Sequence, residues 1–180
     1  MALDSKIVLS LILSLIYCLN LVCVYATSYR ELLVVGQSVG YSDTLVSKGG
    51  NYELRFFTQN IENSIKYYVG IRFTKLLNDR IVWVANRDNA FQTSSAFLTV
   101  QDDGNIVIKD GKMTYDMTFG NNNNSISTYA TLLDTGNLVL VNNSSQAILW
   151  QSFDNPTDTL LPGMNMGYDT ITGRTYAMLP

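Results

Sequence analysis

The chain has 180 residues, a formal net charge of −3, 47% hydrophobic residues and no histidine, and both of its cysteines lie within the first 23 residues. A globular part of about 150 residues buries close to 70% of its unfolded surface, so a single domain can fold here without disulfides. The mild charge lacks a basic stripe and argues against a nucleic-acid partner. With no His, and no Cys after residue 23, the globular part has no residues for a Ser-His-Asp triad, a Cys nucleophile or the usual zinc sites.

The chain begins with a nearly continuous apolar run, Ile7 to Val24, followed by Tyr25 and Ala26. Small residues at 24 and 26 are typical of a signal-peptidase site, so we expect a signal peptide over residues 1–26 and a secreted or extracellular protein. The alternative is an uncleaved anchor at the cell surface, because about 18 apolar residues is the lower limit for crossing a bilayer. Four residues interrupt the run and favour cleavage: Ser10, Ser14, Tyr17 and Asn20.

Short strand patterns dominate from about residue 39 to residue 153. Turn residues separate them roughly every ten positions, as in sandwiches and barrels, and no segment after the leader has a convincing helical period. We therefore expect an all-β fold with almost no helix, and a loss of strand pattern from Gly163 onward. The predicted strands cover residues 51–57, 66–73, 81–85, 97–100, 106–108, 131–133, 138–141 and 148–150.

A near-repeat marks the centre of the chain. The segment 101–108 (QDDGNIVI) returns as 133–140 (LDTGNLVL), so that Asn105 and Asn137 are 32 residues apart. Trp83, Tyr115 and Trp150 follow a similar rhythm, separated by 32 and 35 residues. A period of this length indicates repeated supersecondary units. We expect three hairpins, each donating a large ring to a shared centre.

The first copy of the repeat carries residues suited to hydroxyl groups. Gln101 and Asn105 each offer an amide donor and acceptor, Asp103 offers a strong acceptor, and Val107 offers apolar surface for the C–H face of a sugar. The alternative is that residues 102–105 form only a type I′ turn, since Asp-Gly is a common hairpin sequence.

Three N-glycosylation sequons are present, at Asn123, Asn142 and Asn143. In a secreted protein they are plausible acceptors on exposed loops, and the overlap of the last two allows one glycan there. The polar segment 120–125 around the first sequon predicts a solvated loop. The alternative is that Asn and Ser are present because they form turns well.

The pattern Gln101-x-Asp103-x-Asn105-x-Val107 resembles the mannose-binding motif of bulb-type lectins, which ends in Tyr where this chain has Lys109. Residues 45–54, 83–89 and 150–163 are similar to S-domain receptor-like kinases and S-locus glycoproteins of plants. The resemblance implies a type II β-prism with pseudo-threefold symmetry. It also implies a bulb-type lectin domain over residues 27–163, followed by a truncated extension over residues 164–180.

The same resemblance implies a carbohydrate site formed by Gln101, Asp103, Asn105 and Val107. The second copy retains only Asn137 and Val139 as a degenerate site, since three other motif positions are replaced there, namely by Leu133, Thr135 and Val141. No clear copy is visible in the first unit. The implied partners are mannose-containing glycans or glycoproteins, and a homodimer is compatible with the family.

Two functions follow from these observations. The first is a secreted lectin-like protein that binds mannose-type glycans, a truncated relative of the S-domain receptor kinases. The second is a non-catalytic interaction module that keeps the lectin fold, has lost sugar binding and pairs with receptor-like kinase ectodomains. Neither requires a cofactor or a metal, and neither is an enzyme.

Overall fold

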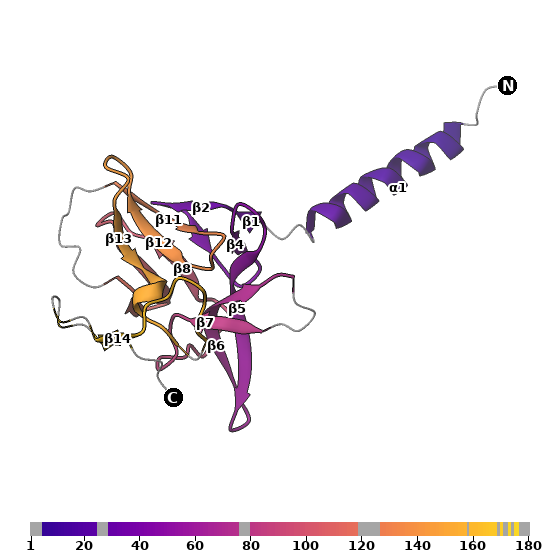
Figure 1. Cartoon of the computed structure of the whole chain (residues 1–180). Coiled ribbons are helices and arrows are strands. Elements are labelled where there is room, and N and C mark those ends of the chain that lie inside the picture. The colour runs from indigo at the N-terminus through magenta and orange to yellow at the C-terminus, as the bar shows by residue number, and fades with distance from the viewer. Residues whose placement is uncertain are drawn as a thin grey trace.

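The computed structural model describes residues 5–24, 29–75, 80–118, 127–157, 159–168, 170, 173 and 175–176. Helix α1 (Ser5–Val24) lies away from a body built of β-strands (Figure 1). Within the described residues, no helix has the length and apolarity that a membrane crossing requires.

Three sheets form the β body, and we number them I to III. Sheet I has the order β1 (Tyr29–Arg30), β4 (Thr44–Val46), β5 (Tyr52–Ile61), β6 (Ser64–Phe73) and β7 (Ile81–Val84). Sheet II has the order β10 (Met113–Asp116), β9 (Ile106–Asp110), β8 (Phe97–Val100) and β3 (Ser38–Val39). Sheet III has the order β13 (Ile148–Gln151), β12 (Leu138–Asn142), β11 (Thr128–Leu132) and β2 (Leu32–Val34). A 3₁₀ turn η1 (Ser152–Asp154) follows β13.

The first described segment of the body joins all three sheets. It contributes β1 to sheet I, β2 to sheet III, β3 to sheet II and finally β4 to sheet I. Among the sheet pairings of the described strands, only β1 with β4 is parallel. This segment therefore ties together three antiparallel hairpin units, and the fold is a type II β-prism with pseudo-threefold symmetry, as the family resemblance implied.

The predicted aromatic centre is confirmed in its position. Trp83 lies on β7, Tyr115 on β10 and Trp150 on β13, which is in each case the edge strand of its sheet. In the strand registers they lie opposite three fully buried aliphatic residues, Ile71, Ile108 and Leu140. The Trp83 and Trp150 rings meet edge to face, 6.3 Å apart. Trp83 is 3% exposed, whereas Tyr115 and Trp150 are half-buried. All three rings line one cavity.

A glycine with positive φ ends one equivalent turn in each unit, at Gly50, Gly104 and Gly136. The N–H of each donates to the carbonyl oxygen of the residue three positions earlier, at 2.8–2.9 Å. Each glycine is followed by Asn and then by a strand. The first unit therefore does contain a copy of the turn. The sequence comparison missed it because the polar motif residues are replaced and the long β5–β6 hairpin disturbs the spacing.

Neither Asp102 nor Asp103 has positive φ, so the β8–β9 turn is not of type I′ as the alternative interpretation held. It is a type I turn followed by a left-handed glycine. Residues 62 and 63, both with positive φ, occupy the two-residue turn between β5 and β6 instead.

The strands predicted from sequence are present, with ends that agree or differ by up to four residues. Strands β1, β3 and β4 have only two or three residues, too short to show an alternating pattern, and were not predicted. Strand β10 reads as polar and was also missed. The stretch after Gly163 is not free of strand, because β14 (Gly167–Tyr168) pairs with β15 (Thr175–Tyr176).

Candidate functional site

The β8–β9 hairpin brings the three polar motif residues to one turn. The N–H of Gly104 donates to the carbonyl oxygen of Gln101, and the N–H of Gln101 donates to that of Asn105, both at 2.9 Å. Gln101, Asp103 and Asn105 are all half-buried, so each keeps some contact with solvent. The backbone thus holds the three side chains in a fixed arrangement.

Part of this polar set is used within the protein. One carboxylate oxygen of Asp103, Oδ1, accepts the backbone N–H of Asn105 at 3.0 Å. The amide oxygen of Asn105 accepts the hydroxyl of Thr118 at 3.2 Å. Among the described residues, no other hydrogen bond of these three side chains is present. The Gln101 amide, Asp103 Oδ2 and Asn105 Nδ2 therefore remain for a ligand.

Val107 differs from the expectation that it presents apolar surface. It lies on the face of β9 opposite to Ile106 and Ile108, yet it is fully buried. Val107 therefore offers no exposed surface to a sugar in this arrangement, because its side chain is packed inside the protein. Lys109 follows on the same face as Val107 and is half-buried.

The second copy of the motif holds the fold together. Asn137 is 6% exposed, its Nδ2 donates to Gln151 Oε1 at 2.9 Å, and its Oδ1 accepts from the Ser152 hydroxyl at 3.1 Å and from the Phe153 N–H at 3.2 Å. Val139 is 1% exposed. The amide of Asn137 is thus occupied internally at both its nitrogen and its oxygen.

The two copies have the same pattern of hydrogen bonds, each with its own hydroxyl residue. In the first, the Thr118 hydroxyl accepts the N–H of Ile106 at 2.9 Å and donates to Asn105. In the second, the Ser152 hydroxyl accepts the N–H of Leu138 at 2.9 Å and donates to the equivalent Asn137. The Asn of the repeat is therefore a structural element in both copies, and only in the first does its amide nitrogen remain unbonded among the described residues.

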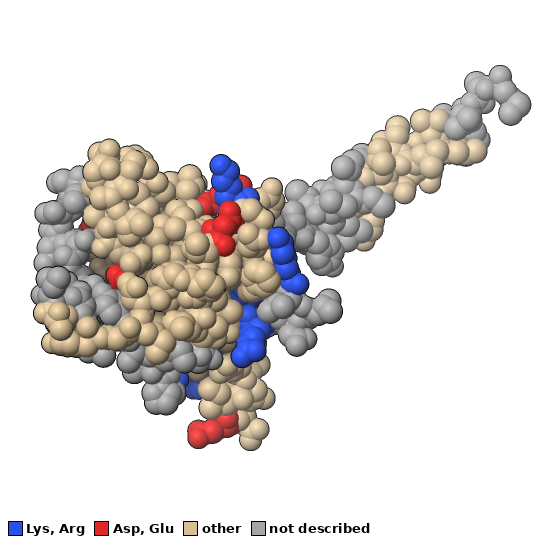
Figure 2. All heavy atoms as spheres, viewed as in Figure 1, with Lys and Arg blue, Asp and Glu red and all other residues tan. Residues whose placement is uncertain are grey.

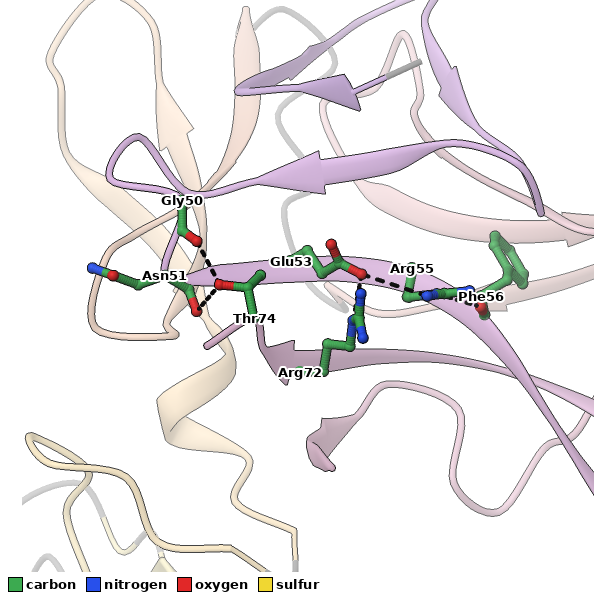
Figure 3. Close-up of polar contacts among 7 residues, drawn as sticks. All are labelled: Gly50, Asn51, Glu53, Arg55, Phe56, Arg72 and Thr74. Carbon is green, nitrogen blue, oxygen red and sulfur yellow. Dashed lines mark hydrogen bonds and ion pairs between the residues drawn. The ribbon is translucent and has the colours of Figure 1, made fainter. Parts of the chain in front are cut away.

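In the first unit, the positions equivalent to Val107 and Lys109 are Glu53 and Arg55, counted from the shared Gly-Asn pair. Figure 3 shows Glu53 between two guanidinium groups, with Arg72 Nε donating to its carboxylate and Arg55 Nη1 at 3.6 Å. Nearby, the Thr74 hydroxyl donates to the carbonyl oxygen of Asn51 at 3.0 Å. This face carries an ion-pair network where the sugar motif would lie.

The outer surface of sheet III carries few charged side chains and some exposed aliphatic ones. In the view of Figure 2 the surface over β11, β12 and β13 is largely uncharged. Leu32, Val34 and Ile148 are exposed there, at 49%, 38% and 53%. Together with the replaced motif positions, this leaves sheet II as the face with a polar motif.

Of the three sequons, Asn123 lies outside the described residues. The side-chain oxygen of Asn142 accepts the N–H groups of Ser144 and Ser145, at 2.8 and 3.0 Å. Asn143 is exposed, and its side chain makes no hydrogen bond within the described part of the chain. Asn143 is therefore the more accessible of the overlapping pair. In the same part of the chain, no three acidic or Cys side chains gather as a metal site would require.

Comparisons with known proteins agree with this geometry. The family described as D-mannose binding lectin matches residues 80–180. The G-type lectin S-receptor-like serine/threonine-protein kinase SD1-29 of Arabidopsis thaliana is 38% identical over 157 residues, which cover 87% of this chain and 19% of the kinase. The S-locus-specific glycoprotein S6 of Brassica oleracea is 45% identical over 136 residues, covering 72% of this chain and 30% of the glycoprotein.

Among solved structures, the Marasmius oreades lectin has the same fold, with a TM-score of 0.52 and 18% identity over 71% of this chain and 95% of that one. The chain spans about a fifth of the length of the curated kinases that it matches, and only their lectin region is shared. The prism fold, the repeat and these similarities show that the chain belongs to the bulb-type D-mannose binding lectin family, together with the G-type lectin S-receptor-like kinases and S-locus glycoproteins.

Proposed function

We propose that this chain is an extracellular lectin-like protein that binds mannose-type glycans at the β8–β9 hairpin. The observation that supports this is the set of unpaired polar atoms on one rigid turn, at Gln101, Asp103 and Asn105, in a chain of the D-mannose binding lectin family. In sheet I the positions equivalent to Val107 and Lys109 hold the ion-paired Glu53 and Arg55, and in sheet III internal hydrogen bonds use the amide of Asn137.

Recognition would proceed through vicinal hydroxyl groups. The Asp103 carboxylate accepts from a hydroxyl, the Asn105 amide nitrogen donates to its neighbour, and the Gln101 amide can do either. Three or four such bonds, each contributing about 0.5–1.5 kcal/mol net, give millimolar affinity for one monosaccharide. Lys109 weakens the site further, because the motif of the family has a Tyr ring at that position.

The test is a titration with methyl α-D-mannopyranoside in which the backbone NMR signals of the hairpin report binding. Gln101→Ala removes a side chain without an internal partner among the described residues, so we expect binding to weaken roughly three- to tenfold with unchanged stability. Asp102→Ala is the matched control, because Asp102 is exposed in the same turn and is not part of the motif. Lys109→Tyr should strengthen binding. Absence of binding in both the wild type and Lys109→Tyr would refute the glycan proposal.

We further propose that residues 1–26 are removed on secretion and that a glycan is attached at Asn143. The accessible side chain of Asn143 supports this choice over Asn142, whose side-chain oxygen closes a turn. N-terminal sequencing of secreted protein should begin at Thr27. Peptide mass spectrometry after enzymatic deglycosylation should find the converted residue at 143, and conversion at 142 alone would contradict the assignment.

A further inference from the structure

A cavity of about 390 Å³ lies where the edge strands of the three sheets approach one another. Its walls include Trp83, Tyr115 and Trp150, one from each sheet, and the segment that follows β13. Small-molecule sites measure about 300–1,000 Å³ and are mostly apolar with a few converging polar groups. None of the hairpin residues Gln101, Asp103 and Asn105 lines this cavity.

Two of the three rings, Trp83 and Trp150, are held in place by the contacts that follow. The indole N–H of Trp83 donates to the backbone carbonyl of Asn155 at 2.8 Å, so it is not available to a ligand. Trp83 and Trp150 lie at 66° to each other, which gives the cavity aromatic walls in two directions. Sheet II contributes the smaller Tyr115 in place of a Trp, which leaves more space at the shared centre than an indole would.

The cavity is also lined by charged and polar side chains. These are the positively charged Arg87, the negatively charged Asp88 and Asp154, and the uncharged Thr157. Desolvation by burial, and then the negative charge of Asp88, raise the pKa of Tyr115 above its usual value. Like any Tyr, Tyr115 is protonated at neutral pH, so its hydroxyl can donate a hydrogen bond. Asp154 accepts from Gln151 Nε2 at 2.9 Å, which fixes the orientation of its carboxylate.

We propose that this cavity is a second saccharide site, independent of the hairpin, and that it binds a β-linked glucosyl residue. Aromatic faces carry partial negative charge and attract the weakly positive C–H groups of a sugar. A pyranose with only equatorial hydroxyls has C–H groups on both faces, whereas the axial hydroxyl of mannose interrupts one face. The rim contains a guanidinium as well as two carboxylates, and this mixture suits a neutral polyhydroxyl ligand better than an ion.

The test uses the intrinsic fluorescence of the full chain, because its only two tryptophans, Trp83 and Trp150, both line the cavity. Titration with cellobiose should change the emission with millimolar affinity, whereas methyl α-D-mannopyranoside should not. Gln101→Ala should leave the cellobiose response unchanged, which separates this site from the hairpin. No response to cellobiose would overturn the proposal.

Two variants locate the ligand. Tyr115→Trp enlarges the third ring and should weaken cellobiose binding at least roughly tenfold, measured by ligand-observed NMR, with the fold checked by circular dichroism. Asp102→Ala is the control, because Asp102 is exposed in the β8–β9 turn and does not line the cavity, so the affinity for cellobiose should change less than about twofold. If choline binds in place of cellobiose and Asp88→Asn abolishes that binding, the cavity is a cation site and the saccharide assignment is wrong. Unchanged cellobiose binding in a folded Tyr115→Trp variant would overturn the location.

Discussion

The equivalent Asn residues of the repeat should differ in what they contribute to stability. Asn137→Ala removes three hydrogen bonds, to Gln151, Ser152 and the N–H of Phe153, and leaves buried partners unpaired. Asn105→Ala removes one hydrogen bond, from Thr118. The two substitutions delete the same atoms at pseudo-symmetric positions, so each is the control for the other.

The magnitudes follow from these contacts. A typical hydrogen bond contributes about 0.5–1.5 kcal/mol net, and a buried group left unpaired adds to the loss. We expect Asn137→Ala to lower the free energy of unfolding by about 3–4 kcal/mol and Asn105→Ala by about 1 kcal/mol. For a domain of about 150 residues the difference corresponds to roughly 6–10 °C in Tm.

Urea unfolding followed by tryptophan fluorescence measures both values. The m-value must be the same in wild type and variants for the comparison of free energies to hold. Equal destabilisation by the two substitutions would refute the conclusion that Asn137 stabilises the fold more than its counterpart Asn105 does. A loss above about 2 kcal/mol for Asn105→Ala would show that this residue also is mainly structural.

Three further predictions concern the core and the cavity. Gly70→Ala should destabilise the fold by about 1–3 kcal/mol, because a Cβ there would lie 2.9 Å from the carbonyl oxygen of Trp83, and urea unfolding would measure it. Trp83→Ala should cost about 3–5 kcal/mol in the same assay, since Trp83 is 3% exposed. The raised pKa of Tyr115 favours its neutral form in the folded state, so its contribution to stability is present below pH 10 and is lost as the pH rises further. Tyr115→Phe should reduce this alkaline loss, and an unchanged pH dependence between 9 and 12 would contradict it.

The architecture was predictable because the repeat encodes it locally. A left-handed glycine followed by Asn and a strand recurs in each unit, with an aliphatic strand in the second and third, and the spacing of three large rings places them on equivalent edge strands. The very short strands β1 and β3 were not predictable, because their position depends on pairing with distant strands and not on a pattern of their own. The copy at Gly50 could have been found from its Gly-Asn pair alone, without the requirement for polar motif residues.

The candidate site was only partly predictable. Residue types identified Gln101, Asp103 and Asn105, but they could not show that Val107 is fully buried. They also could not show that a hydroxyl twelve or more residues downstream, in Thr118 or Ser152, uses the oxygen of each repeat Asn. Such contacts arise from the return of the chain across the sheet, which a local motif does not contain.

Because hydroxyl groups of Ser152 and Thr118 hold the turns closed, the sugar motif can be lost in two sheets while the prism stays intact. The hydroxyl of Ser152 bonds Leu138 and Asn137, so the second turn stays closed although Gln, Asp and Tyr of the motif are replaced. In the β8–β9 turn the Thr118 hydroxyl makes the equivalent hydrogen bonds. Gln101 and one oxygen of Asp103 are therefore left without a structural role among the described residues. Side chains that the fold does not use are free to be selected for a ligand. Under the proposed function we therefore expect sugar recognition to depend on Gln101 and Asp103 more than on Asn105, and Gln101→Ala is the substitution that separates binding from folding most cleanly.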